Sequence, residues 1–358
     1  MKKTLTILAL VLVSILLFSM VVSCDKKPEA PSNDEKGKIG YVTGVGGLGD
    51  NAFNDLGNAG ITMLKEEGFE VNVIEPSASS EYEGIIRNLC EEGGYTLIVT
   101  MGSETVDAVR MAHETFPEQQ FLVIEDMPDI DNVRGVQVDL RDMGFLMGAY
   151  AALMEQSGAL TKGEATKTFG IVGGMDFPLI RAITVAYECG VRHIDPEYEV
   201  LTAFAGSFKD PGKGSELALG FYDQGCRIVA QAAGATGMGV FEAAKDRDLY
   251  AVGSDTNQNS IAPDNIIASA ARRVDLEIYN CGISASKGEF KDGDYLVTLS
   301  TNSEAIKLHY DGSNITPPDS VVKALEKLVK MRVEDKVPLP ETNEGIQEYL
   351  NAVGVFEG

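Results

Sequence analysis

The 358-residue chain contains no tryptophan and only three histidines. His113, His193 and His309 stand far apart, so no two of them have the spacing of a metal site. Stacking on a flat ligand must therefore come from phenylalanine or tyrosine. No Ser-His-Asp or Cys-His arrangement is supported by so few histidines, which argues against nucleophilic catalysis. The sequence predicts a protein that is not an enzyme and that has no metal and no cofactor.

Cysteine is also scarce, with five residues in the whole chain. Cys90, Cys189, Cys226 and Cys281 are widely spaced and form no CxxC pair, so neither a zinc site nor a redox motif is indicated. We interpret these four as buried free thiols that act as small apolar side chains, with disulfides as the alternative.

A single long apolar run lies at the N-terminus, where it extends from residue 5 to residue 22 after Lys2 and Lys3 and ends at Val21-Val22-Ser23-Cys24. Residues 1–23 are therefore predicted to be a lipoprotein signal peptide and Cys24 the lipidation site. A transmembrane helix is the alternative. Residues 24–37 mix both signs of charge and contain two prolines, which predicts a lipid anchor followed by a flexible tether.

Positive charge is in the minority, because 30 Lys and Arg stand against 54 Asp and Glu and give a formal net charge of -24. Such a surface repels nucleic acid and does not bind anionic lipid through a basic patch. Acyl chains at Cys24 must then provide the membrane attachment. We expect the protein on the extracytoplasmic face of the cell membrane, with no nucleic-acid partner.

From Lys38 onward, short β-branched runs alternate with helical stretches, and the pattern occurs in two series. It predicts an α/β fold of two doubly wound parallel-sheet lobes joined by a hinge. The predicted lobes are residues 38–142 with 256–290, and residues 143–255 with 291–358. The predicted strands are 39–42, 71–74, 96–100, 121–124, 169–172, 200–203, 228–231 and 250–252, and the predicted helices are 52–67, 82–92, 106–115, 141–155, the segment after Pro178, 213–224 and 239–245.

Loops rich in glycine, short carboxylates and amides follow these strands, where ligands of open α/β sheets bind. Phe53 and Asn54 stand where the first loop becomes a helix, and an aromatic ring beside an amide suits a nucleobase. Core filling and helix capping are the alternatives for this pair. Asp255 ends a strand, so its carboxylate suits two vicinal ribose hydroxyls, although Asp is also a common helix cap.

Gly44, Gly46 and Gly49 have GxGxxG spacing, which is found in dinucleotide-binding loops. A glycine-rich loop of this kind is more often only a tight strand-to-helix turn, and an exported lipoprotein has little access to NAD. The spacing therefore does not alter the prediction of a protein without a cofactor.

Taken together, these loops resemble those of the basic membrane protein family of solute-binding lipoproteins, which includes purine nucleoside receptors of bacterial ABC importers. The resemblance covers nearly all of residues 38 to about 310. The matching segments are 53–55 (FND) with Gly60, 169–178 (FGIVGGMDFP), 206–211 (GSFKDP), 231–241 (QAAGATGMGVF), 253–258 (GSDTNQ) and 269–275 (SAARRVD).

The resemblance implies a type I periplasmic-binding fold that crosses three times between its lobes and passes its ligand to the permease and ATPase subunits of an importer. It implies that Phe53 and Phe208 sandwich the base and that Asn54 reads the edge of the base. Gly234 and Asp255 are implied as contacts on the far lobe, with Asp255 at the ribose.

Five further residues complete the predicted ligand-binding set, namely Gly102, Glu125, Asp126, Met175 and Arg272. The family usually has Asp at the position of Glu125 and Lys at the position of Arg272, and a planar guanidinium does not substitute simply for an ammonium. The predicted ligand is a purine nucleoside (inosine, guanosine or adenosine). Riboflavin, a free base or a sugar are the alternatives within the class, and a ligand-sensing lipoprotein for a signalling receptor is the alternative role.

Overall fold

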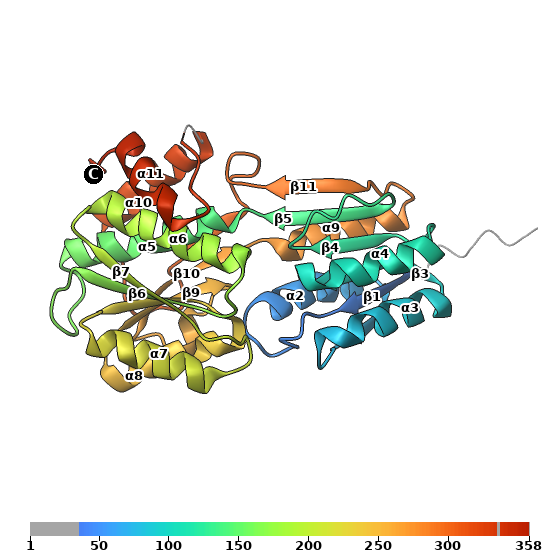
Figure 1. The fold of residues 1–358 in the computed structure, drawn as a ribbon, viewed down its shortest axis with the longest axis horizontal. Coiled ribbons are helices and arrows are strands. Elements are labelled where there is room, and N and C mark those ends of the chain that lie inside the picture. The colour runs from blue at the N-terminus through green and yellow to red at the C-terminus, as the bar shows by residue number, and fades with distance from the viewer. Residues whose placement is uncertain (1–35, 335–336, 358) are drawn as a thin grey trace, which may run out of the picture. The chain divides into compact units, whose positions relative to one another are not determined.

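The computed structural model describes residues 36–334 and 337–357 (Figure 1). Residues 37–358 form one compact unit. The predicted signal peptide and lipidation site at Cys24 lie outside the described residues.

The first lobe is built on a six-stranded parallel sheet in the order β11-β5-β4-β3-β1-β2. Alternate residues of its central strands point to opposite faces, so that Leu97 and Val99 pack under α2 and α9, whereas Ile98 packs under α3 and α4. The elements are β1 (Lys38–Val42), α2 (Phe53–Glu66), β2 (Glu70–Ile74), α3 (Tyr82–Glu92), β3 (Tyr95–Met101), α4 (Val106–Thr115), β4 (Phe121–Ile124), β5 (Val133–Val138), α9 (Val274–Ser286) and β11 (Gly293–Val297).

The second lobe is built on a six-stranded sheet in the order β12-β10-β9-β8-β6-β7, in which only β12 runs antiparallel to its neighbour. The pair α7 and α8 covers one face, and α5 and α6 cover the other, with α10 and α11 packed outside them (Figure 1). The elements are α5 (Leu140–Ser157), β6 (Thr168–Gly173), α6 (Pro178–Ile194), β7 (Glu199–Phe204), α7 (Pro211–Asp223), β8 (Ile228–Ala232), α8 (Gly237–Arg247), β9 (Tyr250–Asp255), β10 (Ile266–Arg272), β12 (Ile306–His309), α10 (Asp319–Glu334) and α11 (Ile346–Val353). Short 3-10 turns lie at Ser79–Glu81, Ser103–Thr105, Gly234–Thr236, Asn259–Ile261 and Asn343–Gly345.

Glycines allow α5 and α6 to pack with their backbones in contact. A Cβ atom at Gly148 would clash with the carbonyl oxygen of Tyr187, and one at Gly190 would clash with that of Phe145. Almost every residue of α5 is buried, which is why this helix lacks the polar face expected of a surface helix.

The chain crosses between the lobes three times, as the family resemblance implies. It leaves the first sheet after β5 to form α5, returns after β10 to form α9, and leaves again after β11 to form β12. The three crossings therefore lie near residues 139, 273 and 298–305. This architecture confirms the predicted two-lobe α/β fold.

The sheet assignment corrects the predicted lobe boundaries at two strands. Residues 256–290 were assigned to the first lobe, but β10 lies in the second sheet, where it pairs with β9 on one side and β12 on the other and is buried along its whole length. Residues 291–358 were assigned to the second lobe, but β11 extends the first sheet beside β5. Each of these two crossings therefore comes one strand later than predicted. The physical reason is that the sheet to which a strand belongs is decided by its pairing with other strands, β12 and β9 for β10 and β5 for β11.

The four cysteines of the two lobes are free and buried, as predicted. Burial raises the pKa of Cys90 to about 11 and that of Cys189, Cys226 and Cys281 to about 12. They are therefore packing residues rather than reactive thiols.

Candidate functional site

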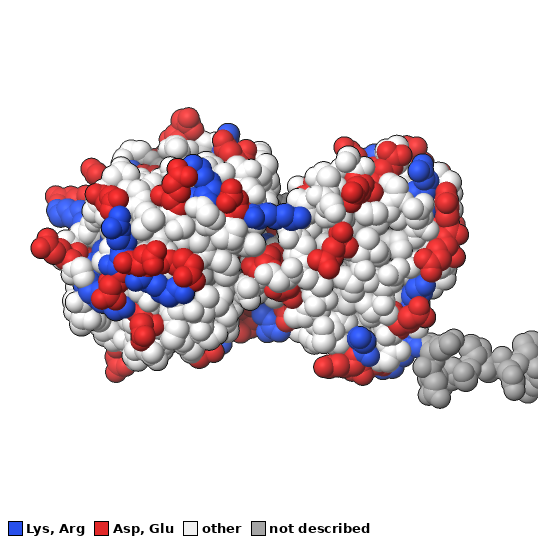
Figure 2. Space-filling model, turned by 90° about the horizontal axis from the view of Figure 1, so that it is seen from below, with Lys and Arg blue, Asp and Glu red and all other residues white. Residues whose placement is uncertain are grey.

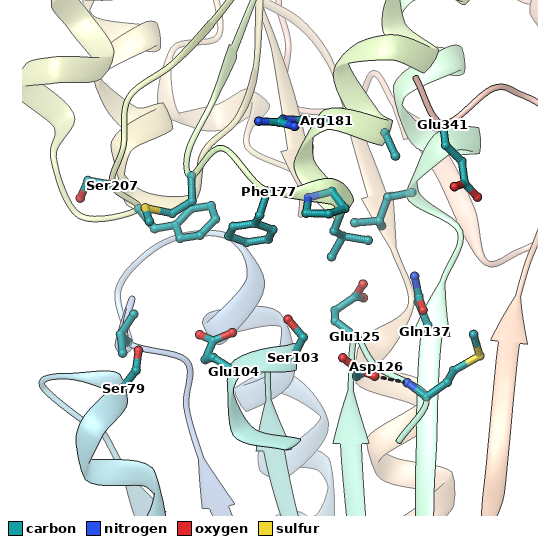
Figure 3. Close-up of a pocket in the computed structure, with 18 of the residues that line it drawn as sticks. Ser79, Ser103, Glu104, Glu125, Asp126, Gln137, Phe177, Arg181, Ser207 and Glu341 are labelled. Atoms are coloured by element: carbon teal, nitrogen blue, oxygen red, sulfur yellow. Dashed lines mark hydrogen bonds between the residues drawn. The ribbon is translucent and has the colours of Figure 1, made fainter. Parts of the chain in front are cut away.

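Two adjoining cavities lie at the carboxyl ends of the strands and are lined by both lobes. The inner cavity has a volume of about 90 Å³, and the outer cleft one of about 1090 Å³. They share Val45, Ser103, Glu104, Glu125, Leu140, Phe177, Leu179 and Phe208, so the inner cavity is the deep end of the cleft. Figure 3 shows Phe177 and Arg181 on the side of the second lobe facing Ser103, Glu104 and Glu125 of the first.

All ten predicted ligand-binding residues line one or both cavities. The inner cavity is lined by Phe53, Asn54, Gly102, Glu125, Phe208, Gly234, Asp255 and Arg272. The outer cleft adds Asp126 and Met175. The structure thus brings the set together, while the roles of these residues toward a ligand remain predictions.

A buried cluster of three charged side chains, which we call the charged triad, lies at the base of the inner cavity. Arg272 pairs through Nη1 with Glu125 Oε1 and through Nη2 with Asp255 Oδ1, the latter at 2.7 Å. Between 3% and 10% of each of the three side chains is exposed. Glu125 belongs to the first lobe and the other two residues to the second, so the triad joins the lobes.

Both acidic residues of the triad have a left-handed backbone conformation and lie at the end of a strand. Glu125 follows β4 with a φ of 70°, and Asp255 ends β9 with a φ of 71°. Non-glycine residues rarely adopt this conformation, which costs of order 1–3 kcal/mol and recurs at binding sites. The two strands occupy equivalent places in their sheets, each between the third strand and the crossing strand, so the lobes present matched carboxylates to the cleft.

The triad leaves two buried polar atoms without a hydrogen-bond partner among the described residues, namely Glu125 Oε2 and Arg272 Nε. Burial raises the pKa of Glu125 to about 7, because the pairing with Arg272 offsets only part of the desolvation of the carboxylate and Asp255 and Asp126 repel it. Buried polar atoms are usually paired, so unpaired atoms on two residues that line the inner cavity indicate a place for a polar ligand.

The loop before α2 is held by Asp50 and Asn54. Asp50 accepts hydrogen bonds from the backbone N–H groups of Ala52, Asn54 and Asp55, and so caps the helix. Asn54 accepts from Gly44 N–H at 2.8 Å and donates from Nδ2 to Asp50 Oδ2 at 2.9 Å. The Asn54 amide therefore organises the loop, and one N–H and one lone pair remain for a ligand.

Aromatic side chains from both lobes border the inner cavity. The Phe53 ring lies under the Arg272 guanidinium, with 4.8 Å between Cζ and the ring centroid. Phe208 packs against Gly174, where a Cβ atom would overlap the Phe208 ring, and over Gly234. Phe177, which was not among the predicted site residues, meets Phe208 edge to face with the centroids 6.0 Å apart. The X-Pro step at Phe177 is a helix-start signal, and only the fold shows that its ring turns into the cleft.

A second set of contacts joins the lobes beside the triad. The Asn51 carbonyl of the first lobe accepts from Thr256 Oγ1 at 2.7 Å and from Gln258 Nε2 at 2.8 Å. Gln258 is itself fixed by a buried network, because its Oε1 accepts from Gln231 Nε2 and from Ser254 N–H. These bonds therefore add a second link between the lobes, at Asn51.

The described residues contain no group of three or more His, Cys, Asp and Glu side chains placed to hold a metal ion. Carboxylates dominate the cleft as they dominate the surface, where Figure 2 shows acidic side chains over both lobes. Among the helices of the described segments, none combines the length and apolarity needed to cross a membrane.

Comparisons with known proteins agree with this geometry. A family model for PnrA-like substrate-binding proteins of ABC transporters (Bmp) matches residues 38–342. Basic membrane protein D of Borreliella burgdorferi is 30% identical over 274 residues, 74% of this chain and 76% of the relative. An uncharacterized lipoprotein of Pyrococcus abyssi is 27% identical over 348 residues, 93% of this chain and 83% of the relative.

A solved structure supports the same fold. The solute-binding protein of an ABC transporter from Aeropyrum pernix K1 superposes with a TM-score of 0.77 at 22% identity, covering 88% of this chain and 97% of that chain. With the family match over 38–342 and the two-lobe cleft, the chain belongs to the basic membrane protein (Bmp, PnrA-like) family and is the substrate-binding component of an ABC transporter, not an enzyme.

Proposed function

We propose that this protein captures a purine nucleoside in the inner cavity and delivers it to the permease and ATPase subunits of an importer. The observation that carries the proposal is the charged triad, which places orphaned polar atoms beside the Phe53 ring. A nucleoside combines a flat, weakly polar ring with a sugar that carries vicinal hydroxyls. It therefore needs aromatic faces and charged hydrogen-bonding groups within one cavity.

The base stacks between Phe53 and Phe208, which border the cavity from opposite lobes. The ribose hydroxyls donate to Asp255, whose Oδ1 is already bound to Arg272 and whose second oxygen is available. The combined inner cavity and outer cleft provide the volume that a nucleoside requires, since the inner cavity alone is smaller than a typical ligand pocket of at least about 300 Å³.

Charge in the cavity favours a nucleoside over a nucleotide. Asp50, Glu104, Glu125 and Asp255 line the inner cavity against a single cation, Arg272. A phosphate group would be brought close to these carboxylates, and like charges at short range in a poorly hydrated site repel strongly. The part of the ligand that enters the inner cavity is therefore uncharged or cationic.

The membrane location follows from the N-terminus and from the relatives. Cys24 carries the lipid, and residues 24–37 tether the two lobes to the extracytoplasmic face of the cell membrane. This proposal is supported by the lipoprotein named among the relatives.

Isothermal titration calorimetry on the chain from Asp25 onward tests the ligand. Inosine, guanosine and adenosine should bind tightly and raise the unfolding temperature, whereas hypoxanthine, ribose and riboflavin should bind weakly. Phe208→Ala should weaken the nucleoside about 10- to 100-fold, in line with the loss of one stacking face. Phe290→Ala is the control, because Phe290 is half-buried and lies outside both cavities. Tight binding of riboflavin or of a sugar, with none of any nucleoside, would refute the proposed ligand and leave the transport class intact.

A further inference from the structure

Glu125 has one satisfied and one unsatisfied carboxylate oxygen. Oε1 accepts from Arg272 Nη1, whereas Oε2 has no partner among the described residues, although only 3% of the side chain is exposed. Glu125 also lines both cavities, and Figure 3 shows its side chain in the outer cleft. A ligand bound against Glu125 would therefore find in Oε2 an atom without a competing hydrogen-bond partner among the described residues.

The charges that surround Glu125 leave its protonation state close to balance. Arg272 of β10 is the only cation of the triad, and it divides its hydrogen bonds between Glu125 and Asp255 of β9. Asp126, the next residue along the chain, adds a second negative charge. Burial and these two carboxylates outweigh the cation, so the pKa of Glu125 rises from its ordinary value of 4.5 to about 7.

A carboxyl group in this position offers opposite chemistry in its two states. As a carboxylate, Oε2 only accepts a hydrogen bond, and as a carboxylic acid it donates one. Purine nucleosides divide along the same line, because 6-oxopurines carry a hydrogen on N1 and 6-aminopurines carry a lone pair there. In the proposed complex the edge of a base stacked on the free face of Phe53 would lie near Glu125, since Arg272 pairs with Glu125 and also lies 4.8 Å from the centroid of the Phe53 ring.

We propose that Glu125 reads the base in both protonation states, accepting from N1–H of inosine or guanosine as a carboxylate and donating to N1 of adenosine as a carboxylic acid. The inference rests on the proposed function and assigns the choice between the two purine classes to one proton. Binding of a 6-oxopurine then requires the proton to be absent, and binding of a 6-aminopurine requires it to be present.

The sign of the pH dependence follows directly. Below about pH 7, inosine must displace a proton from Glu125, so its affinity falls as the pH falls. Above about pH 7, adenosine must bring a proton in, so its affinity falls as the pH rises. The two effects combine into a preference for inosine over adenosine that grows about tenfold for each pH unit, or about 100-fold from pH 6 to pH 8.

Titration calorimetry of the chain from Asp25 onward with inosine and with adenosine at about pH 6, 7 and 8 measures this preference. Repeating each titration in two buffers of different ionisation enthalpy counts protons: adenosine should take up about one at pH 8, and inosine should release about one at pH 6. Glu125→Gln carries both a donor and an acceptor but no titrating proton, so its preference should not vary with pH. Glu118→Gln, the same change at an exposed residue, should keep the wild-type slope.

The outcomes separate this inference from the proposed function. Nucleosides that bind with a pH-independent preference overturn the role of Glu125 and leave the nucleoside receptor standing. A slope that persists in Glu125→Gln assigns the proton to another group and also overturns the inference. Absence of binding by any nucleoside at all three pH values overturns both. Circular dichroism of each variant confirms that it is folded before its titration is interpreted.

Discussion

Replacing Asp255 by asparagine should weaken the nucleoside far more than the free base. Asp255 ends β9, accepts from Arg272 Nη2 at 2.7 Å and has a side chain that is 10% exposed. In the proposed complex its second oxygen accepts from the ribose, which hypoxanthine lacks and inosine carries. Asparagine keeps the size of the side chain and one acceptor oxygen but removes the charge, so the fold is preserved while the hydroxyl contact is weakened.

The size of the effect comes from the ribose contact alone. A hydrogen bond to a charged group contributes about 1.5–3 kcal/mol, so loss of this contact corresponds to about 10- to 150-fold in affinity. Asp255→Asn also weakens the pairing with Arg272, but this cost is shared by inosine and hypoxanthine. The ratio of the two affinities therefore isolates the sugar, in the manner of a double-mutant cycle.

Calorimetric titration of the wild type and of Asp255→Asn with inosine and hypoxanthine provides the four affinities. Asp246→Asn, the same change at an exposed residue of α8, should leave all of them at their wild-type values. If Asp255→Asn reduces the affinities for inosine and hypoxanthine by the same factor, Asp255 does not contact the ribose and acts through Arg272 instead.

Three further predictions concern stability. The pKa of Glu125 is about 7 in the folded protein, above its ordinary value of 4.5, so deprotonation of Glu125 destabilises the folded state. The wild type should therefore lose about 3 kcal/mol of unfolding free energy from this group as the pH rises from 4.5 to 7. Denaturant unfolding of Glu125→Gln should not show this loss. Gly46→Ala should lower the unfolding free energy by about 1–3 kcal/mol, because the added Cβ would lie 2.5 Å from Asn54 Nδ2. An unchanged midpoint of thermal unfolding would contradict this packing. Asp142→Ala should lower the unfolding free energy by about 3–5 kcal/mol in urea, because it removes the buried carboxylate whose Oδ1 lies 2.8 Å from Arg332 Nε. A loss below about 1 kcal/mol would refute this pairing.

The first and last residues of helices and strands with strong periodic patterns could be predicted to within one or two positions. The helix α4 begins and ends at the predicted residues Val106 and Thr115, and β4 also has its predicted bounds, Phe121 and Ile124. Their apolar residues face a single core, so local preference and tertiary packing agree. For the same reason the loops at the strand ends could be recognised as the site, since parallel strands place their carboxyl ends at one edge.

The crossing strands could not be assigned in the same way. The strand β10 has the sequence IIASAAR, whose small residues show no alternation because both of its faces are buried. The strand β11, GDYLV, is largely exposed at the edge of the first sheet, and its membership depends on pairing with β5, about 160 residues earlier in the chain. Such pairing is a property of the whole fold, and local sequence does not encode it.

The contacts within the candidate site also depend on pairing between distant segments, which local sequence does not encode. Glu125, Asp255 and Arg272 could each be named from their positions, but not their mutual pairing, because Arg272 reaches both carboxylates only when β10 lies in the second sheet beside β9. The edge-to-face packing of Phe177 on Phe208 also depends on contacts between distant loops. Sequence identified residues that line the site, and tertiary structure decided which of them pair and which of their atoms remain without a partner.

Arg272 lies where the chain crosses between the lobes and also pairs with a carboxylate of each lobe. Arg272 is the last residue of β10, and the next residue, Arg273, donates its N–H to the Ala305 carbonyl of another crossing. A ligand favours the closed form only to the extent that it binds that form more strongly than the open form. In the proposed complex Glu125 and Asp255 would contact the nucleoside from different lobes, so both contacts would require the two lobes to stay together. Because Arg272 already holds these two carboxylates together, a nucleoside in the proposed complex would meet polar groups that need little reordering.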